Sequence, residues 1–271
     1  MEEQQPAATH AGLIHTLATL PVAAVFCLFL GQVMLHSEPA ANFTWQLPWL
    51  IALAALSTLT ALARQLQWQY VLTAAGICAV GGGVAQGFGA ETGIPFGPFT
   101  FGLDAGPQFF NQLPWTVPVI WLVVLFNSRG VGRLILRPWR KLKTYGFWLI
   151  GFAAVLSGLF DLGMDPFLSR WQHYWLWAPT KLRVTWEGAP LTAALGWVFV
   201  TVLILAFATP VLIKKQPGQR APSDYHPLVL WAGGMVLFAV VAGRQGLWGA
   251  VGLDAVAGAA ATVAAIRGAR W

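Results

Sequence analysis

The chain has 271 residues, of which 57% are hydrophobic and only 10% are charged, and its mean hydropathy is +0.62. Water-soluble domains carry about 25% charged residues, so this composition excludes an ordinary soluble protein. Because a membrane-spanning helix needs about 20 apolar residues, the length predicts an all-α, polytopic bundle of about eight spans. Residues 1–271 should form a single integral membrane domain.

The N-terminal half contains the first four expected spans. Residues 1–10 form a polar tail that lacks the basic leader of a cleavable signal peptide, so we expect the first span to be retained. The four apolar segments are 13–35, 47–63, 70–89 and 115–126, the last of which is short and can extend toward residue 136.

Small residues recur at four-residue spacing near the end of the third span, at Gly83, Gly87, Gly89, Gly93 and Gly97. This spacing lets a neighbouring helix or a ligand approach the backbone closely. Helix packing alone would explain the pattern.

The C-terminal half supplies four more expected spans, at 144–162, 189–213, 226–243 and 247–266. In this arrangement twelve of the sixteen basic residues fall on the side that carries both termini: Arg64, Arg129, Arg133, Arg137, Arg140, Lys141, Lys143, Lys214, Lys215, Arg220, Arg267 and Arg270. The positive-inside rule then predicts a multi-pass protein of the inner (plasma) membrane with both termini in the cytoplasm. Topology and anionic lipid heads explain the basic charge, and no nucleic-acid partner is needed.

Residues 167–187 are rich in aromatic side chains, namely Trp171, Tyr174, Trp175, Trp177 and Trp186. Amphipathic rings favour the boundary between head groups and hydrocarbon. We expect a short helix, or a helix and loop, in the interface, where it serves as a lid or simply as an anchoring belt.

Several chemistries find no support in the sequence. Cys27 and Cys78 are isolated within expected spans, and the five histidines lack the clustered spacing of metal ligands. Nucleotide-binding and serine-hydrolase motifs are absent from the sequence. No metal or other cofactor is therefore expected.

Carboxyl groups at membrane depth are the remaining candidates for chemistry, because charge in hydrocarbon is costly and tends to be functional or paired. Four acidic residues lie within or at the ends of expected spans: Glu91, Asp161, Asp165 and Asp254. Asp161 and Asp165 share a helical face if the helix persists to Pro166. Asp165 precedes that proline and would otherwise serve only to end the helix.

Two stretches are expected to face each other near one membrane surface, 86–101 and 161–166. Two neighbouring carboxyl groups in a poorly solvated site cannot both ionise cheaply, so the pair can supply an acid and a base together. We leave Asp254 outside this site because it can instead bond between helices.

Three motifs carry a resemblance to a known family: E-T-G-I-P-F-G-P-F-T-F at 91–101, D-L-G-M-D-P at 161–166 and G-A-P-L-T-A-A-L-G-W at 188–197. In order and spacing they resemble the carotenoid biosynthesis membrane proteins, which include carotenoid 1,2-hydratases of the CruF type. The resemblance covers about residues 70 to 205. It implies addition of water to the terminal double bond of an acyclic carotenoid, leaving a tertiary alcohol, without a cofactor.

This chain departs from the family pattern at four positions. The family has Glu at Gln86, tyrosines at Phe99 and Phe101, and Asn at Ala193. Each change removes a polar or titratable group. The resemblance therefore leaves open that Glu91 substitutes for them, that another polyene is the substrate, or that the chain is not a hydratase.

The chemistry implied requires a proton donor, a base that positions water, and aromatic faces beside a tertiary cation. We assign Asp161 as the acid, with Asp165 or Glu91 orienting water, although the two roles could be exchanged. The expected aromatic walls are Phe96, Phe99 and Trp171. Further side chains expected to contact the polyene are Gln86, Phe101, Trp175 and Trp197.

Two other functions compete with hydration. The four lost polar groups favour a carotenoid- or isoprenoid-binding membrane protein without catalysis. Glycine-broken helices would suit a small-solute transporter, but the two halves of the chain show no internal repeat. The expected partners are a polyene and the lipid bilayer, and the sequence leaves a homo-oligomer open.

Overall fold

The computed structural model describes residues 5–35, 45–102, 105–179, 184–213 and 223–271. The chain is 76% helical, which confirms the all-α expectation. Within the described ranges, eight helices are long and apolar enough to cross a membrane. They are α1 Gln5–Leu35, α2 Gln46–Ala63, α3 Trp68–Thr92, α4 Thr116–Ile135, α5 Tyr145–Pro166, α6 Thr192–Val211, α7 His226–Arg244 and α8 Trp248–Ala269.

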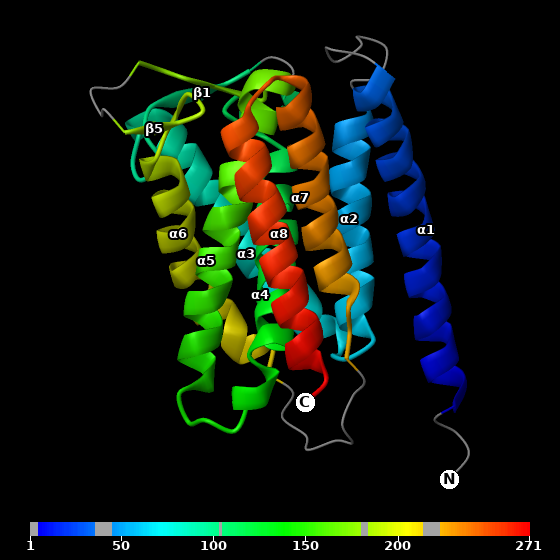
Figure 1. The fold of residues 1–271 in the computed structure, drawn as a ribbon. Helices are drawn as coiled ribbons and strands as arrows, with labels where there is room; N and C mark the ends of the chain where they lie inside the picture. Colours follow the sequence, from blue (N-terminus) through cyan, green and yellow to red (C-terminus); the bar gives the residue numbers. More distant parts are fainter. Residues whose placement is uncertain (1–4, 36–44, 103–104, 180–183, 214–222) are drawn as a thin grey trace.

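The bundle is built around α4, which packs against α2, α3, α5, α7 and α8 (Figure 1). In contrast, α1 lies at the edge against α2 and α7, and only 17% of its most apolar window is buried. Large apolar side chains such as Phe147 and Phe207 are exposed on the outside of the bundle. An apolar exterior on helices of this length suits a lipid environment, so the protein is a multi-pass membrane protein.

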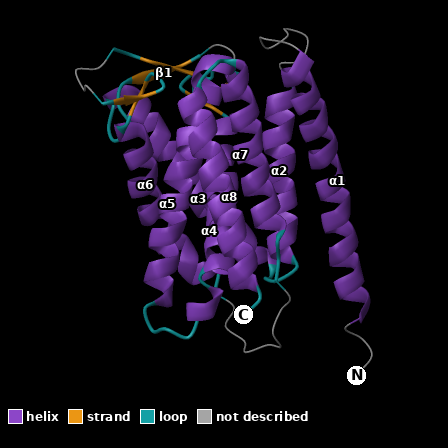
Figure 2. Ribbon diagram, in the orientation of Figure 1, coloured by secondary structure: helices purple, strands orange, loops and turns teal. Residues whose placement is uncertain are grey.

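Short strands cap one end of the bundle (Figure 2). Three antiparallel pairs form there: β1 Phe99–Phe101 with β4 Trp175–Trp177, β2 Gln108–Phe109 with β3 Leu113–Pro114, and β5 Thr185–Trp186 with β6 Ala189–Pro190. The β1–β4 pair sets Phe99 opposite Trp177 and Phe101 opposite Trp175. The start of α1 and the end of α8 lie at the opposite end of the bundle (Figure 1).

Two glycines of α3 allow the tightest packing near this cap. A Cβ at Gly82 would overlap the Trp121 ring, and one at Gly89 would lie 2.6 Å from Phe96. The indole of Trp121 in turn stacks on that of Trp197, with ring centroids 3.6 Å apart and planes 8° apart. Gly87, which the four-residue pattern singled out, has nothing within 4 Å.

The structure corrects several expected boundaries. Helix α1 begins at Gln5, within the expected polar tail, and α6 begins at Thr192, because the preceding residues pair as strands. Asp165 does not end a helix. The chain continues through Pro166 into a π-helical turn, Phe167–Trp171. The proline has no N–H for the Leu162 carbonyl one turn earlier, which accepts the indole N–H of Trp186 at 2.9 Å instead.

The aromatic segment 167–187 is a buried cap rather than a belt of exposed rings. Trp171, Tyr174 and Trp175 are each at most 3% exposed, because the β1–β4 pairing folds this segment onto the ends of α3 and α5. The helical part that we expected is limited to the π-helical turn. Residues 180–183 of this segment lie outside the described ranges, as do Lys214, Lys215 and Arg220 of the basic loop.

We predict that Gly82→Ala lowers the free energy of unfolding by about 1–3 kcal/mol, because the added methyl group must displace the Trp121 ring. Gly87→Ala in the same helix meets open space and should leave stability unchanged or slightly raised, since alanine favours the helix. Thermal unfolding of the two purified variants in detergent, followed by circular dichroism, makes the comparison. Equal melting temperatures would contradict the packing described.

Candidate functional site

Asp165 is the most fully bonded side chain at the capped end of the bundle. Its carboxyl group is 2% exposed and accepts hydrogen bonds from the indole N–H groups of Trp175, at 2.7 Å, and Trp177, at 3.0 Å. The hydroxyl of Ser169 lies 3.5 Å away, and the guanidinium of Arg170 is close enough to interact electrostatically. A buried carboxyl group needs such partners to offset the loss of water.

The geometry of β4 explains why two indoles reach one carboxyl group. Residues two apart in a strand point to the same face, so Trp175 and Trp177 both turn inward while Leu176 between them is 51% exposed. Pairing with β1 holds this strand in register, and the Phe99 ring packs edge-on against Trp177 at 5.3 Å. Phe101 packs against Phe99 in the same way, at 5.4 Å.

Asp161 lies one helical turn before Asp165 and is equally buried. The two carboxyl groups are close enough to interact electrostatically, and the side chain of Trp197 lies beside Asp161. The stack of Trp197 on Trp121 fixes that indole in place. The structure therefore brings Asp161 and Asp165 together, as their spacing predicted.

A third aromatic ring, Phe96, packs next to the stack of Trp121 and Trp197. Its ring lies between α3 and α6, where the built Cβ positions of Gly89 and Gly196 would be 2.6 and 2.7 Å from it. The Phe96 and Trp121 rings are tilted, with centroids 6.1 Å apart. Only glycines leave room for an aromatic ring at this depth between two helices.

Several buried polar atoms around the walls form no hydrogen bond within the described part of the chain. They are Gln86 Oε1, Thr116 Oγ1, Trp121 Nε1 and the Tyr174 hydroxyl. Gln86 shares the α3 face of Gly82 and Gly89, and Tyr174 lies beside Thr116. Burial raises the pKa of Tyr174 to about 12, so its hydroxyl keeps its proton near neutral pH. These atoms can bind water or the polar end of a ligand.

One expected member of the site, Glu91, is on the surface. Glu91 is exposed at the end of α3, because it points about 200° around the helix from Gly89. Trp171 is buried in the core at the end of the π-helical turn that follows α5. The site also contains three side chains that were not among the site residues expected from the sequence, namely Trp121, Tyr174 and Trp177. The alternation W-L-W at 175–177 was the one available signal for Trp177.

An apolar groove of about 280 Å³ runs beside the site, between α1, α2, α4, α5 and α7. Phe160 and Met164 of α5 line it. Each stands directly before one of the two aspartates in the sequence. Neither aspartate lines the groove itself. The groove and the carboxyl pair thus occupy adjacent faces of α5.

We predict that Trp177→Phe lowers the free energy of unfolding by about 1–3 kcal/mol, because Asp165 loses a hydrogen-bond donor while it stays buried. Trp148→Phe is the matched control, since Trp148 is 63% exposed on α5. Thermal unfolding in detergent measures both variants. An equal effect of the two substitutions would contradict the role given to the indole N–H.

The chain is similar to known proteins of carotenoid biosynthesis. The family described as carotenoid biosynthesis protein matches residues 46–261. Bisanhydrobacterioruberin hydratase of Haloarcula japonica is 29% identical over 157 residues, covering 55% of this chain and 50% of that protein, so the chain spans about half the length of this curated relative. No solved structure matches the chain. Since the family match covers well over half of its residues, the chain belongs to the carotenoid biosynthesis protein family.

Proposed function

We propose that this protein is a carotenoid hydratase that adds water to the terminal C1,2 double bond of an acyclic (ψ) carotenoid end. The observation that carries the proposal is the pair of buried carboxyl groups, Asp161 and Asp165, enclosed by indoles where the bundle meets its cap. The name of the Haloarcula japonica relative supports the same reaction class. Hydration needs an acid, a base and water at an apolar site, and these residues can supply the first two.

The surroundings of the two aspartates support different roles. Asp165 accepts two indole hydrogen bonds and lies near Arg170, so its charged form is the better stabilised of the two. Among the described residues, Asp161 has no comparable set of donors, and the side chain of Trp197 lies beside it. We therefore assign Asp161 as the proton donor and Asp165 as the base that positions water.

The proposed reaction balances with water alone. The proton of Asp161 adds to C2 of the alkene, which leaves a tertiary cation at C1. A water oxygen then bonds to C1 while Asp165 takes a proton from that water, and proton exchange returns the pair to its starting state. We assign the faces of Phe96, Phe99 and Trp197 to stabilise the cation. Phe99 packs against Trp177, which bonds to Asp165, and Phe96 packs against Trp121, which stacks on Trp197.

The apolar groove suits the polyene chain. Its lining is almost entirely aliphatic and aromatic. One of its walls is α5, the helix that also carries the two aspartates. A carotenoid lying in the groove would keep its long apolar body in a lipid-like environment, with only its end at the polar cluster. No cofactor is required by this chemistry.

We further propose that the 271 residues form one domain in the plasma membrane, with the start of α1 and the end of α8 at the cytoplasmic side. The excess of basic residues at that end supports this orientation. The strand cap and the aspartates would then lie near the outer face. A homo-oligomer is compatible with this arrangement.

Co-expression with lycopene in a heterologous host tests the proposed reaction. The wild-type protein should yield hydroxylated pigment, and Asp161→Asn or Asp165→Asn should reduce its amount by about 100-fold or more, because each removes a proton-transfer group. Mass spectrometry of lipid extracts measures the products. Asp254→Asn is the matched control, since Asp254 of α8 is equally buried but packs against Gly163, on the face of α5 opposite the two aspartates. Full activity of Asp161→Asn would refute the assignment.

Glu91→Gln separates the two candidate bases. Because Glu91 is exposed and apart from the pair, we expect this variant to keep its hydratase activity within about twofold, as surface substitutions usually do. The same lycopene extracts provide the measurement. If Glu91→Gln lost activity while Asp165→Asn retained it, the base would be Glu91 rather than Asp165.

A second candidate function is carotenoid binding without catalysis. Gln86, Phe99 and Phe101 line the site without the titratable groups that the family carries there, which favours this reading. Purification after co-expression distinguishes the two functions. Chemically unchanged pigment that copurifies with the protein supports binding alone, whereas a tertiary alcohol supports the hydratase.

A further inference from the structure

A second cavity, of about 310 Å³, lies at the end of the bundle opposite the strand cap. It is enclosed by α2, α4 and α7 together with the chain that follows α4. Four arginines line it, namely Arg129, Arg133, Arg137 and Arg140. The cavity is therefore strongly basic, in contrast to the apolar groove near the aspartates.

The four arginines reach one cavity because of their spacing. Arg129 and Arg133 are four residues apart on α4 and so share a helical face. The chain then turns through a 3₁₀ helix, Arg137–Trp139, which keeps Arg137 and Arg140 along the same side. The guanidinium of Arg137 donates to Ser223, so at least one of the four is already fixed in position.

Arg129 is the informative member of the set. Arg129 is only 5% exposed, and its Nε has no hydrogen-bond partner in the described structure. The groups that interact with it electrostatically are Arg133, Tyr145 and Cys78, none of which is a carboxylate. Among the described residues, none of the groups that interact with Arg129 is a counter-ion. A buried cation in that situation is costly, so the site calls for an anion.

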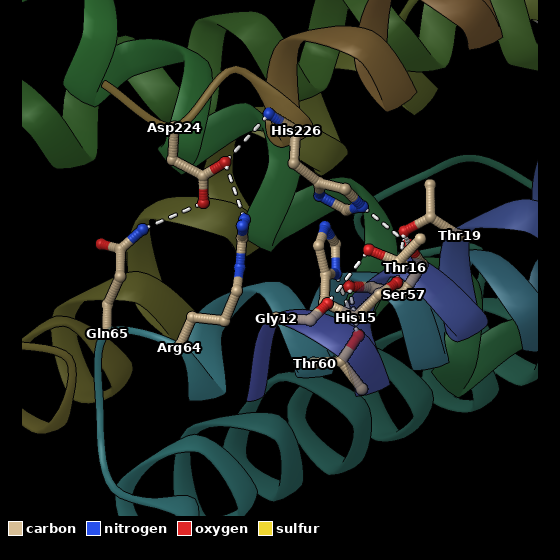
Figure 3. A network of polar contacts seen from close by, with 10 residues as sticks. All are labelled: Gly12, His15, Thr16, Thr19, Ser57, Thr60, Arg64, Gln65, Asp224 and His226. Atoms are coloured by element: carbon tan, nitrogen blue, oxygen red, sulfur yellow. Dashed lines mark hydrogen bonds and ion pairs between the residues drawn. The ribbon is translucent and has the colours of Figure 1, made fainter. Parts of the chain in front are cut away.

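The carboxylate that lines this cavity does not meet the need. Asp224 already accepts hydrogen bonds from Arg64 at 3.1 Å, from Gln65 at 2.9 Å and from the backbone N–H of His226 at 3.1 Å (Figure 3). Its charge is thus matched by Arg64, which forms an ion pair with it. On the other wall, Arg129 Nε has no hydrogen-bond partner among the described residues and is available to a ligand.

The positive-inside rule does not account for this arrangement by itself. That rule concerns basic residues in the loops and at the ends of the spans, as with the exposed Lys141 and Lys143. In contrast, Arg129 lies inside α4, more than one turn before the helix ends at Ile135. Its burial within a cavity indicates a binding site rather than a topological signal.

We propose that this cavity binds a phosphate group. Guanidinium groups match phosphate oxygens in charge and in their paired donor geometry, and the Tyr145 hydroxyl in the same lining adds a neutral donor. The cavity is at the end of the spans, where the head group of an anionic phospholipid would lie. A soluble phosphate compound carries the same chemistry and would enter from the aqueous side.

Binding measurements on the full-length protein in detergent test the proposal. Native mass spectrometry with added phosphatidylglycerol measures lipid retention, and thermal unfolding with inorganic phosphate or diphosphate measures soluble anions. We expect Arg129→Gln combined with Arg133→Gln to weaken binding at least about tenfold, because charge-assisted hydrogen bonds are lost. Phosphatidylcholine, which has no net charge, should bind weakly to every form.

Lys141→Gln combined with Lys143→Gln is the matched control. It removes the same number of positive charges from exposed positions of the adjoining loop, outside the cavity lining. If the wild-type protein and the lysine control both retain phosphatidylglycerol, the ligand is a lipid head group. If phosphate or diphosphate stabilises both of these forms and phosphatidylglycerol is not retained, the ligand is a soluble phosphate compound. Binding of neither, or equal loss in both double variants, would overturn the proposal.

A second variant protects the test against misfolding. If Arg129→Gln prevents folding, Arg133→Gln combined with Arg140→Gln removes two guanidinium groups that are exposed at the rim of the cavity. Anion binding should still weaken at least about fivefold relative to the lysine control, since fewer charge-assisted bonds remain. Unchanged binding in this folded variant would also overturn the proposal.

Discussion

The hydrogen bonds from Trp175 and Trp177 to the carboxyl group of Asp165 connect the two parts of this protein. They tie a short strand of the cap to the end of a membrane-spanning helix. A carboxyl group placed there without partners would destabilise the bundle, because its loss of water would go uncompensated. The pairing of β1 with β4 therefore determines both the closure of the bundle and the shape of the candidate site.

A second constraint comes from the packing of aromatic rings against glycine. Trp121 can stack on Trp197 only because Gly82 leaves space behind it, and Trp197 then reaches Asp161. The carboxyl pair is thus surrounded by rings whose positions are set by backbone contacts between α3, α4 and α6. A rigid aromatic enclosure of this kind suits a reaction through a cation, since it needs little rearrangement as charge develops.

The sequence was sufficient for the features that depend on local patterns. Eight apolar stretches and the four-residue spacing of Asp161 and Asp165 predicted the spans and the carboxyl pair. It was insufficient for contacts between distant segments: the pairing of 99–101 with 175–177 brings Trp177 to Asp165, and no local pattern encodes that pairing. Glu91 was expected to join the pair but is exposed at the end of α3. The helical path continues through Pro166 into a π-helical turn, since the Leu162 carbonyl that the proline cannot bond accepts the indole N–H of Trp186, which lies far along the chain.

The two ends of the bundle have opposite chemistry, with carboxyl groups and indoles under the cap and a cavity lined by guanidinium groups at the other end. The central claim is that the carboxyl pair adds water to a polyene. Purified protein in lipid vesicles that contain an acyclic carotenoid, supplied with water enriched in oxygen-18, tests this most directly. The account predicts one oxygen-18 atom in each hydrated end, and none when both aspartates are replaced by asparagine. Pigment that stays unlabelled with the wild-type protein, or labelling that persists in the double variant, would contradict it.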